Sequence, residues 1–453
     1  LSAVASCFAL IVGAAIASPA WAETRLGLVI GNANYPDAPV KTAANDGALV
    51  AETLRSVGFD VSEGRDLDQT SMRRVMRDFV EKIDAAGDET VVFVYFAGHA
   101  LQFAGANYLI PVDARLQRPA DLGAETIMLN TLLGDLAGSK SKTRFVVIDG
   151  ASPHPFVEQA KLARGPALAT PTEGALIAFS SSGGEAIIEA KEDYGVYAQA
   201  LLEMLREPGL SPDEIFNRIK LRVHEKTKGA NTPMHASAIP VGFHFLERAE
   251  SAPNAATQQL DPRTLPMNQL DPATAYAVAI ERDTLKAYQE FVALFPNDPL
   301  AKKVRARIAQ KREALAWRRA TQQRTREAYW TYRRWYPRGP HFEDAGYELT
   351  ALAAPLAAPA GFVDVVWEEV PPPVGDEIAY FDEALPPALA YVDIAPPPPP
   401  LVLLPAPIYY APPPPPAAPT AAGLLPLIGL AAIPAIAVLP KLVRPAPPRP
   451  TFP

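Results

Sequence analysis

A histidine and an aspartate stand at the ends of two predicted buried strands. His99 lies near the end of the segment 94–100 (VYFAGHA), and Asp149 lies near the end of the segment 145–151 (FVVIDGA). Open α/β folds place their functional sites at the carboxyl ends of their strands. We therefore expect the chemistry or the binding function of this chain at that edge of a sheet.

Cysteine chemistry depends on one residue, because Cys7 is the only cysteine of the chain. It lies in the uncharged apolar stretch 1–22, which closes with Ala20-Trp21-Ala22. Small residues in this spacing are typical of a signal-peptidase site, so we predict a signal peptide over 1–22 and export to the periplasm or cell envelope. A membrane anchor made of the same residues is the alternative. A mature chain beginning at Glu23 would have no cysteine, which excludes disulfides, thiolate metal sites and cysteine catalysis.

Short apolar segments alternate with amphipathic ones from residue 23 to residue 248. This order predicts an α/β fold with a largely parallel sheet and helices on both faces. Ser71 is the expected cap of the second helix. The predicted strands are 25–31, 59–63, 90–97, 144–149, 174–180 and a last one near 241–246, and the predicted helices are 43–57, 71–85 and 211–226.

The two strand ends resemble the catalytic histidine and cysteine segments of the caspase and metacaspase family. Further similar segments are Val29-Ile30-Gly31-Asn32, Asn45-Asp46, 108–113 (YLIPVD) and Pro155-Phe156. The resemblance extends over about half of the chain, residues 23–248, and implies a caspase-like three-layer α/β/α sandwich. In that family the activity is cysteine endopeptidase cleavage, in which a histidine assists a thiolate and backbone amides hold the oxyanion.

By this resemblance His99 matches the catalytic histidine, whereas Ala151 occupies the nucleophile position. A methyl group cannot attack a carbonyl, so we predict an inactive peptidase. The family's glycine after the histidine is Ala100 here, which restricts the backbone of the oxyanion hole. Ser152 would need a rearranged loop to replace the cysteine, because consecutive Cα atoms lie about 3.8 Å apart and adjacent side chains point differently. His154 is expected to be a surface or loop histidine, and we predict no metal and no cofactor.

Asp46 and Asp149 resemble acidic positions that line a pocket for a basic side chain in metacaspase-like proteins. Paired carboxylates can hold an arginine or lysine by charge-assisted hydrogen bonds. The predicted partner is therefore a peptide or protein with basic residues. Helix capping beside Asn45 is the alternative role for Asp46, and an ordinary loop hydrogen bond is the alternative for Asp149.

A linker over 249–270 and a helical repeat module over 271–350 follow. The pattern Ala287-Tyr288-x-x-Phe291 with Phe295-Pro296 recurs 41 residues later, which is typical of stacked helical hairpins. Between residues 302 and 338 there are 13 Lys or Arg residues against Glu313 and Glu327. We expect either a solvated helical face with its aromatics in the core or a surface for an anionic envelope component, and no nucleic acid, because the chain is predicted to be exported.

The segment 351–453 is predicted to be a proline-rich tail. The chain has 49 prolines, and uninterrupted runs occupy 396–400 and 412–416, which favour extended polyproline II. The segment 421–440 has no charge and is long enough to span a bilayer, although Pro426 and Pro434 would each remove a helix hydrogen bond. Membrane association and protein binding both remain open for this tail.

Three functions fit these observations. The first is a binding or scaffold protein of the envelope that carries an inactive caspase-like domain. The second is an active caspase-family peptidase that cleaves after basic residues with an unrecognised nucleophile. The third is a mainly structural tail protein in which the folded domain only anchors. The net charge of −8 is modest for 453 residues and does not distinguish them.

Overall fold

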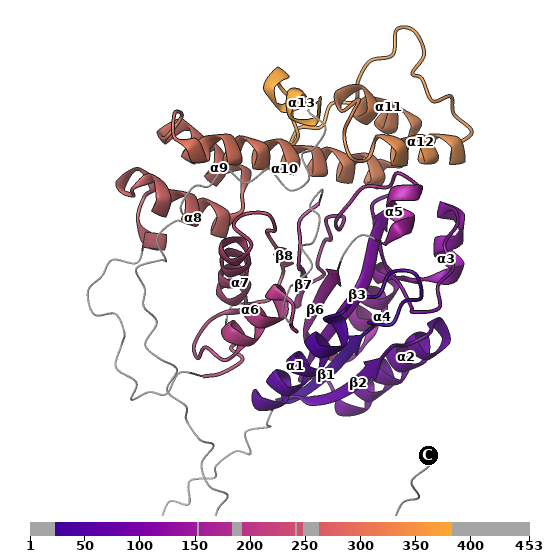
Figure 1. The fold of residues 1–453 in the computed structure, drawn as a ribbon, viewed down its shortest axis with the longest axis vertical. Helices are drawn as coiled ribbons and strands as arrows, with labels where there is room; N and C mark the ends of the chain where they lie inside the picture. Colours follow the sequence, from indigo (N-terminus) through magenta and orange to yellow (C-terminus); the bar gives the residue numbers. More distant parts are fainter. Residues whose placement is uncertain (1–22, 152–153, 184–192, 241, 248–261, 383–453) are drawn as a thin grey trace, which may run out of the picture. The chain divides into compact units, whose positions relative to one another are not determined.

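The computed structural model describes residues 23–151, 154–183, 193–240, 242–247 and 262–382 (Figure 1). The predicted signal peptide, Cys7, Ser152, the proline runs and the apolar segment 421–440 lie outside the described residues. Two parts are defined here by their residues: the sheet domain, 23–247, and the helical module, 262–382.

One sheet, with strand order β2-β1-β3-β6-β7-β8, forms the centre of the sheet domain. The strands from β2 to β7 pair in parallel, and β8 pairs antiparallel with β7. Their bounds are β1 (Thr24–Gly31), β2 (Asp60–Arg65), β3 (Thr90–Phe103), β6 (Ser141–Ala151), β7 (Ala175–Phe179) and β8 (Met234–Ser237). Two short strands, β4 (Ala106–Leu109) and β5 (Ile127–Met128), extend from the end of β3.

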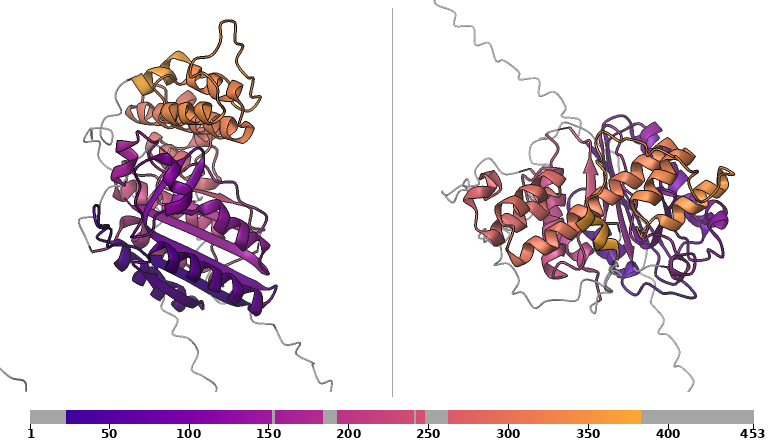
Figure 2. Two further views of the ribbon diagram at one scale, coloured as in Figure 1. Left: turned by 90° about the vertical axis from the view of Figure 1, so that its right-hand side faces the viewer. Right: turned by 90° about the horizontal axis from the view of Figure 1, so that it is seen from above.

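Helices cover both faces of the sheet, as predicted (Figures 1 and 2). Helices α1 (Ala43–Ser56), α6 (Val196–Leu205) and α7 (Pro212–Lys226) pack on one face, and α2 (Gln69–Ala86) and α4 (Leu129–Gly138) pack on the other. The segments between the strands also contain two short helices, α3 (Leu122–Glu125) and α5 (Pro155–Gln159), and a 3-10 turn, Pro119–Asp121. Burial on both faces explains why the central strands are apolar throughout.

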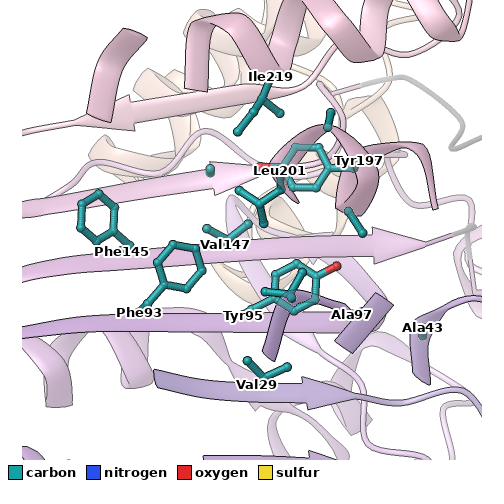
Figure 3. Close-up of a cluster of buried hydrophobic side chains, with 14 of the residues drawn as sticks. Val29, Ala43, Phe93, Tyr95, Ala97, Phe145, Val147, Tyr197, Leu201 and Ile219 are labelled. Atoms are coloured by element: carbon teal, nitrogen blue, oxygen red, sulfur yellow. The ribbon is translucent and has the colours of Figure 1, made fainter. Parts of the chain in front are cut away.

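The side chains of β3 alternate between the two layers. Phe93 and Tyr95 pack under α1 and α6, while Val92 and Val94 pack under α2 and α4. Figure 3 shows the first of these clusters, with Phe93 beside Phe145, whose ring centroids lie 5.7 Å apart. This two-residue period is the geometry of a strand, and it fixes which residues reach the carboxyl edge.

The last strand of the sheet is not where the sequence pattern placed it. The prediction of a strand near 241–246 is wrong: residues 242–247 are irregular, and β8 lies earlier, at Met234–Ser237. The apolar signal came from two aromatic rings, because Phe243 and Phe245 pack on Phe145 at centroid distances of 5.3 and 4.7 Å. They fill the core without joining the sheet.

Two other local predictions are corrected. Asp68, not Ser71, caps α2, since its carboxylate accepts the backbone N–H of Ser71 at 2.7 Å. Strand β3 does not end at Ala97 but continues to Phe103, where it turns back into β4.

The 41-residue repeat of the sequence is visible in the helix caps of the helical module. Asp283 and Arg324 both have a left-handed backbone, with φ of 46° and 51°. Each is followed by a threonine N-cap, Thr284 or Thr325. The helices are α8 (Pro272–Arg282), α9 (Leu285–Leu294), α10 (Pro299–Gln323), α11 (Arg326–Trp335), α12 (Phe342–Ala351) and α13 (Gly375–Asp382).

The packed part of the helical module is longer than the predicted 271–350. Met267, in one of two 3-10 turns (Pro262–Thr264 and Met267–Gln269), is fully buried beside α8 and α9. At the other end Trp367, Val370 and Phe381 belong to the cluster of α10 and α11. The segment 375–382 contains no proline, which allows α13 to form inside what we predicted to be the tail.

The basic run 302–338 places its aromatic rings in the core. Trp317, Tyr332 and Tyr336 are at most 2% exposed. Several arginines of the run bind partners within the helical module, among them Arg312 with Glu377 at 2.8 Å and Arg334 with Asp364 at 3.0 Å. Among the described residues, no helix has both the length and the apolar character to cross a membrane.

Candidate functional site

The two strand ends singled out from the sequence meet at one edge of the sheet. Strands β3 and β6 are neighbours in register, with Ala97 opposite Asp149 and His99 opposite Ala151. The structure thus brings together three of the four predicted site residues by strand pairing alone.

His99 is enclosed by the loop that follows β1. Its side chain is 1% exposed, and its Nε2 lies 2.7 Å from the carbonyl oxygen of Ala38. The backbone N–H of His99 donates to the hydroxyl of Tyr35 at 3.0 Å, and that hydroxyl donates to the carbonyl of Ile110 at 2.8 Å. The rings of Tyr35 and His99 pack edge to face, with their centroids 4.5 Å apart. In this arrangement the imidazole is held by the protein and shielded from solvent.

Glycines on both strands permit this close packing. Gly98 has φ of +154°, and a Cβ atom there would lie 2.6 Å from the Tyr35 hydroxyl. On β6, a Cβ atom at Gly150 would lie 3.0 Å from the methyl group of Ala100. Ala100, at the position of the family's glycine, is therefore accommodated because its neighbour has no side chain.

His154 contacts His99, which the sequence analysis missed. Their ring centroids lie 5.2 Å apart at an interplanar angle of 88°. The Nδ1 of His154 accepts the backbone N–H of Phe156 at 3.3 Å and caps α5. Burial, followed by the nearness of His99, lowers the pKa of His154 to about 4, so this ring is neutral at physiological pH.

His154 was expected to lie on the surface or in a loop. It does lie in a loop, at the N-cap of α5, but it is partly buried against the site. The one sequence signal for a contact between His154 and the site was its position just after the end of the second site strand. Among the described residues, no group of three or more His, Cys, Asp or Glu side chains is arranged to hold a metal ion.

Asp46 and Asp149 form a buried acidic pair. They are 3% and 8% exposed, and no lysine or arginine of the described residues forms an ion pair with either. Burial raises the pKa of Asp46 to about 7, and the charge of Asp149 adds to the effect, while the hydrogen bond from Gly195 opposes it. Burial also raises the pKa of Asp149. Two carboxyls in this state are unfavourable unless protons or a cation neutralise them.

The hydrogen bonds of the pair show which elements hold each carboxyl. Asp46 does not cap its own helix: its Oδ1 accepts the backbone N–H of Gly195, at the start of α6, at 2.7 Å. Asp149 accepts the hydroxyl of Tyr95, on the neighbouring strand, at 2.8 Å. The carboxyls are therefore positioned by elements far apart in the sequence.

Two tyrosines that the sequence analysis did not single out line the acidic pair. Tyr95 binds Asp149 directly, and Tyr197 lies close enough for the charge of Asp149 to raise its pKa, after burial. Among the described residues the buried hydroxyl of Tyr197 has no hydrogen-bond partner. Figure 3 labels both residues within the buried cluster on this face of the sheet. A hydroxyl inside an otherwise apolar strand, as in Tyr95, was the available sequence signal.

Comparison with known proteins agrees with this geometry. Residues 24–243 match the family described as the caspase domain. Over 94 residues the chain is 31% identical to the human mucosa-associated lymphoid tissue lymphoma translocation protein 1. That match covers 20% of this chain and 11% of the length of the human protein.

Proposed function

Residues 24–243 are a caspase domain of the caspase-like peptidase family, and we propose that this domain is inactive as a peptidase and binds a basic side chain at Asp46 and Asp149. The fold and the family confirm the resemblance read from the sequence. The inactivity, the ligand and the role in the cell are the proposal.

The observation that carries the proposed inactivity is the residue opposite His99. Ala151 lies there in register, and its side chain offers no nucleophile. Cys7, the single cysteine of the chain, is in the segment 1–22, far away in sequence. Cleavage after basic residues would therefore need another nucleophile, such as Ser152.

The acidic pair supports the proposed binding role. A guanidinium or ammonium group between Asp46 and Asp149 would neutralise two carboxyls that otherwise oppose each other's ionisation. An arginine has five donors in a rigid fork, enough to bind both carboxylates and the unpartnered hydroxyl of Tyr197. The proposed ligand is accordingly a peptide or protein segment with an exposed basic residue.

We further propose that the chain acts as a scaffold of the cell envelope after export. Support comes from the apolar stretch 1–22, from the helical module and from the proline-rich tail. An anionic envelope component remains a proposed partner of the helical module, through basic residues that are exposed, such as Lys302, Arg305 and Arg338. The buried aromatics take no part in that surface. Membrane association of 421–440 stays a proposal.

Binding of matched peptides to the full chain tests the proposed ligand. Fluorescence anisotropy would compare a labelled peptide containing one arginine with the same peptide containing citrulline, its neutral isostere. We expect the arginine peptide to bind at least tenfold more tightly than the citrulline peptide. Asp149→Asn should remove most of that preference, because the buried guanidinium would lose a carboxylate partner and an unpaired buried charge is costly. Asp60→Asn, which removes a surface carboxylate paired with Lys82, is the matched control. Equal affinity for both peptides would rule out the acidic pair as a cation site.

A further inference from the structure

The strand that carries His99 continues beyond the site as a hairpin. Strand β3 runs four residues further to Phe103, turns at Ala104 and Gly105, and returns as β4. Both turn residues have positive φ, 52° and 77°, as a two-residue hairpin turn requires. The N–H of Ile110 donates to the carbonyl of His99 at 3.0 Å. Any contact that holds the hairpin is thus connected through two hydrogen-bonded strands to the backbone at His99.

A buried histidine of the helical module binds this hairpin. The Nε2 of His341, at the start of α12, lies 3.0 Å from the side-chain oxygen of Gln102 on β3. Its Nδ1 lies 2.6 Å from a carboxylate oxygen of Glu313 on α10. Trp317 stacks on the imidazole with a centroid distance of 4.8 Å and an interplanar angle of 14°. His341, Gln102 and Glu313 are each at most 4% exposed, so both ring nitrogens are held by buried partners.

The tip of the hairpin also contacts α10. A Cβ atom at Gly105 would lie 2.7 Å from the hydroxyl of Thr321. The glycine therefore has two roles, since it supplies the positive φ of the turn and the space for the helix.

The loop that follows the second site strand is attached to the same hairpin. The side chain of Asn107, on β4, donates to the carbonyl of Ala167 at 3.0 Å and accepts its N–H at 2.8 Å. Tyr347 of α12 lies 5.8 Å from Phe103 between ring centroids, and its hydroxyl donates to the carbonyl of Ala160 at 3.5 Å. The helical module thereby reaches both the strand of His99 and the chain that continues from Ala151.

We propose that the helical module is a regulatory clamp on the caspase domain: through His341 and Tyr347 it fixes the β3–β4 hairpin and with it the edge of the sheet that carries His99. Loss of these contacts loosens the hairpin and changes the affinity of the site for its ligand. That last effect rests on the proposed function, whereas the clamp itself does not.

Hydrogen exchange of the full chain, followed by mass spectrometry, tests the clamp without any ligand. His341→Ala removes the contact from the side of the module, and Gln102→Leu removes it from the side of the hairpin. Arg312→Gln is the control, because Arg312 lies on α10, as Glu313 does, but pairs with Glu377 of α13 and not with the hairpin. Tyr347→Ala is a second module variant with little risk to folding, because Tyr347 is 40% exposed.

We expect His341→Ala to accelerate exchange in residues 100–110 and 160–168 by about tenfold, because a buried hydrogen bond is lost while the strands β1 and β7 stay protected. The double variant with Gln102→Leu should exchange no faster than the faster single variant, as two changes in one contact are not additive. Tyr347→Ala should accelerate the same two regions to a smaller extent. If His341→Ala unfolds the module, the Tyr347 variant decides.

Unchanged protection of residues 100–110 in every folded module variant would overturn the clamp. The arginine peptide then separates the two proposals: weaker binding in His341→Ala, with binding unchanged in Arg312→Gln, is the expected coupling. Failure of the wild-type chain to bind the peptide would count against the proposed ligand alone, because hairpin exchange still reports the clamp.

Discussion

At the scale of residues, the ends of two neighbouring strands of the caspase domain place His99 opposite an alanine. His99 and Ala151 remain opposite each other because strand pairing, not the side chain at 151, sets their positions. The acidic pair remains as well, although two buried carboxyls with raised pKa values lower the stability of the fold at neutral pH. A bound cation would offset this cost, which is the physical reason for the binding role proposed above.

The raised pKa of Asp46 predicts how ligand affinity depends on pH. Below a pKa of about 7 the carboxyl holds a proton, which a cationic ligand must displace. We expect the affinity for the arginine peptide to rise between pH 5.5 and 7, by up to about tenfold per pH unit, and to level off above pH 8. Anisotropy titrations across this range measure it. Asp46→Asn should bind more weakly and with a flatter profile, whereas an affinity that falls with rising pH would contradict the assignment.

The replaced nucleophile predicts the outcome of peptidase assays. We expect no turnover of an arginine or lysine peptide library by the wild-type chain. Ala151→Cys should give at most slow cleavage, because Ala100 stands where the family has a glycine beside the expected oxyanion hole, and the loss of one oxyanion donor typically costs on the order of 10² to 10³ in rate. The decisive control is His99→Ala: wild-type turnover that disappears in this variant would show an active peptidase and point to Ser152.

At the scale of elements, the helical module is organised by caps and by a buried polar cluster. Thr284 and Thr325 cap α9 and α11 in the same way, so the caps repeat with the helices. The cluster is less regular. Asp344, in the first turn of α12, is fully buried, and among the described residues neither of its carboxyl oxygens has a hydrogen-bond partner. Burial raises its pKa to about 7, with His341 opposing and Glu313 adding to the shift.

Asp344 should make the stability of the module depend on pH. The folded state keeps a proton that the unfolded state releases near pH 4, so the contribution of Asp344 to stability is greatest below pH 4 and is lost as pH rises towards 7, by up to about 1.4 kcal/mol per pH unit. Asp344→Asn removes this loss, and its stability relative to wild type should therefore be greater at pH 8 than at pH 5. Urea unfolding at both pH values measures the difference. The exposed neighbour Glu343→Gln is the control, and an equal difference at both pH values would contradict the prediction.

At the scale of the whole molecule, the helical module is built onto the caspase domain over residues 262–382. Leu221 of α7 lies in the same apolar cluster as α8, α9 and α10. His224 of α7 lies 2.9 Å from the hydroxyl of Tyr276, and Arg307 donates to the hydroxyl of Thr232 at 2.5 Å. These contacts join segments that the sequence pattern assigned to separate domains.

The extent of the core predicts which fragment folds. A fragment of residues 271–350, the predicted bounds of the helical module, lacks Met267, Trp367 and Phe381 from its two clusters. Because truncation of a single buried aromatic costs about 3–5 kcal/mol, we expect this fragment to be partly folded or to melt well below a fragment of residues 262–382. Circular dichroism melts compare the two. Equal melting temperatures would mean that the added segments contribute nothing to stability.

The sequence alone determined the features that depend on local pattern. Short continuous apolar runs located β1, β3, β6 and β7, and parallel strands end at one edge, so His99 and the 149–151 segment were expected at the same edge of the sheet. The 41-residue repeat likewise identified paired helices before any contact was known.

Only the tertiary structure decided the features that depend on partners distant in the sequence. Local periodicity reports that a side chain is buried but not what buries it, so Phe243 and Phe245 looked like a strand. The same limit hid the contact of His154 with His99 and the bond of Asp46 to Gly195. It also hid the contact between His341 and Gln102, which spans 239 residues of sequence and is created only when the helical module packs against the β3–β4 hairpin.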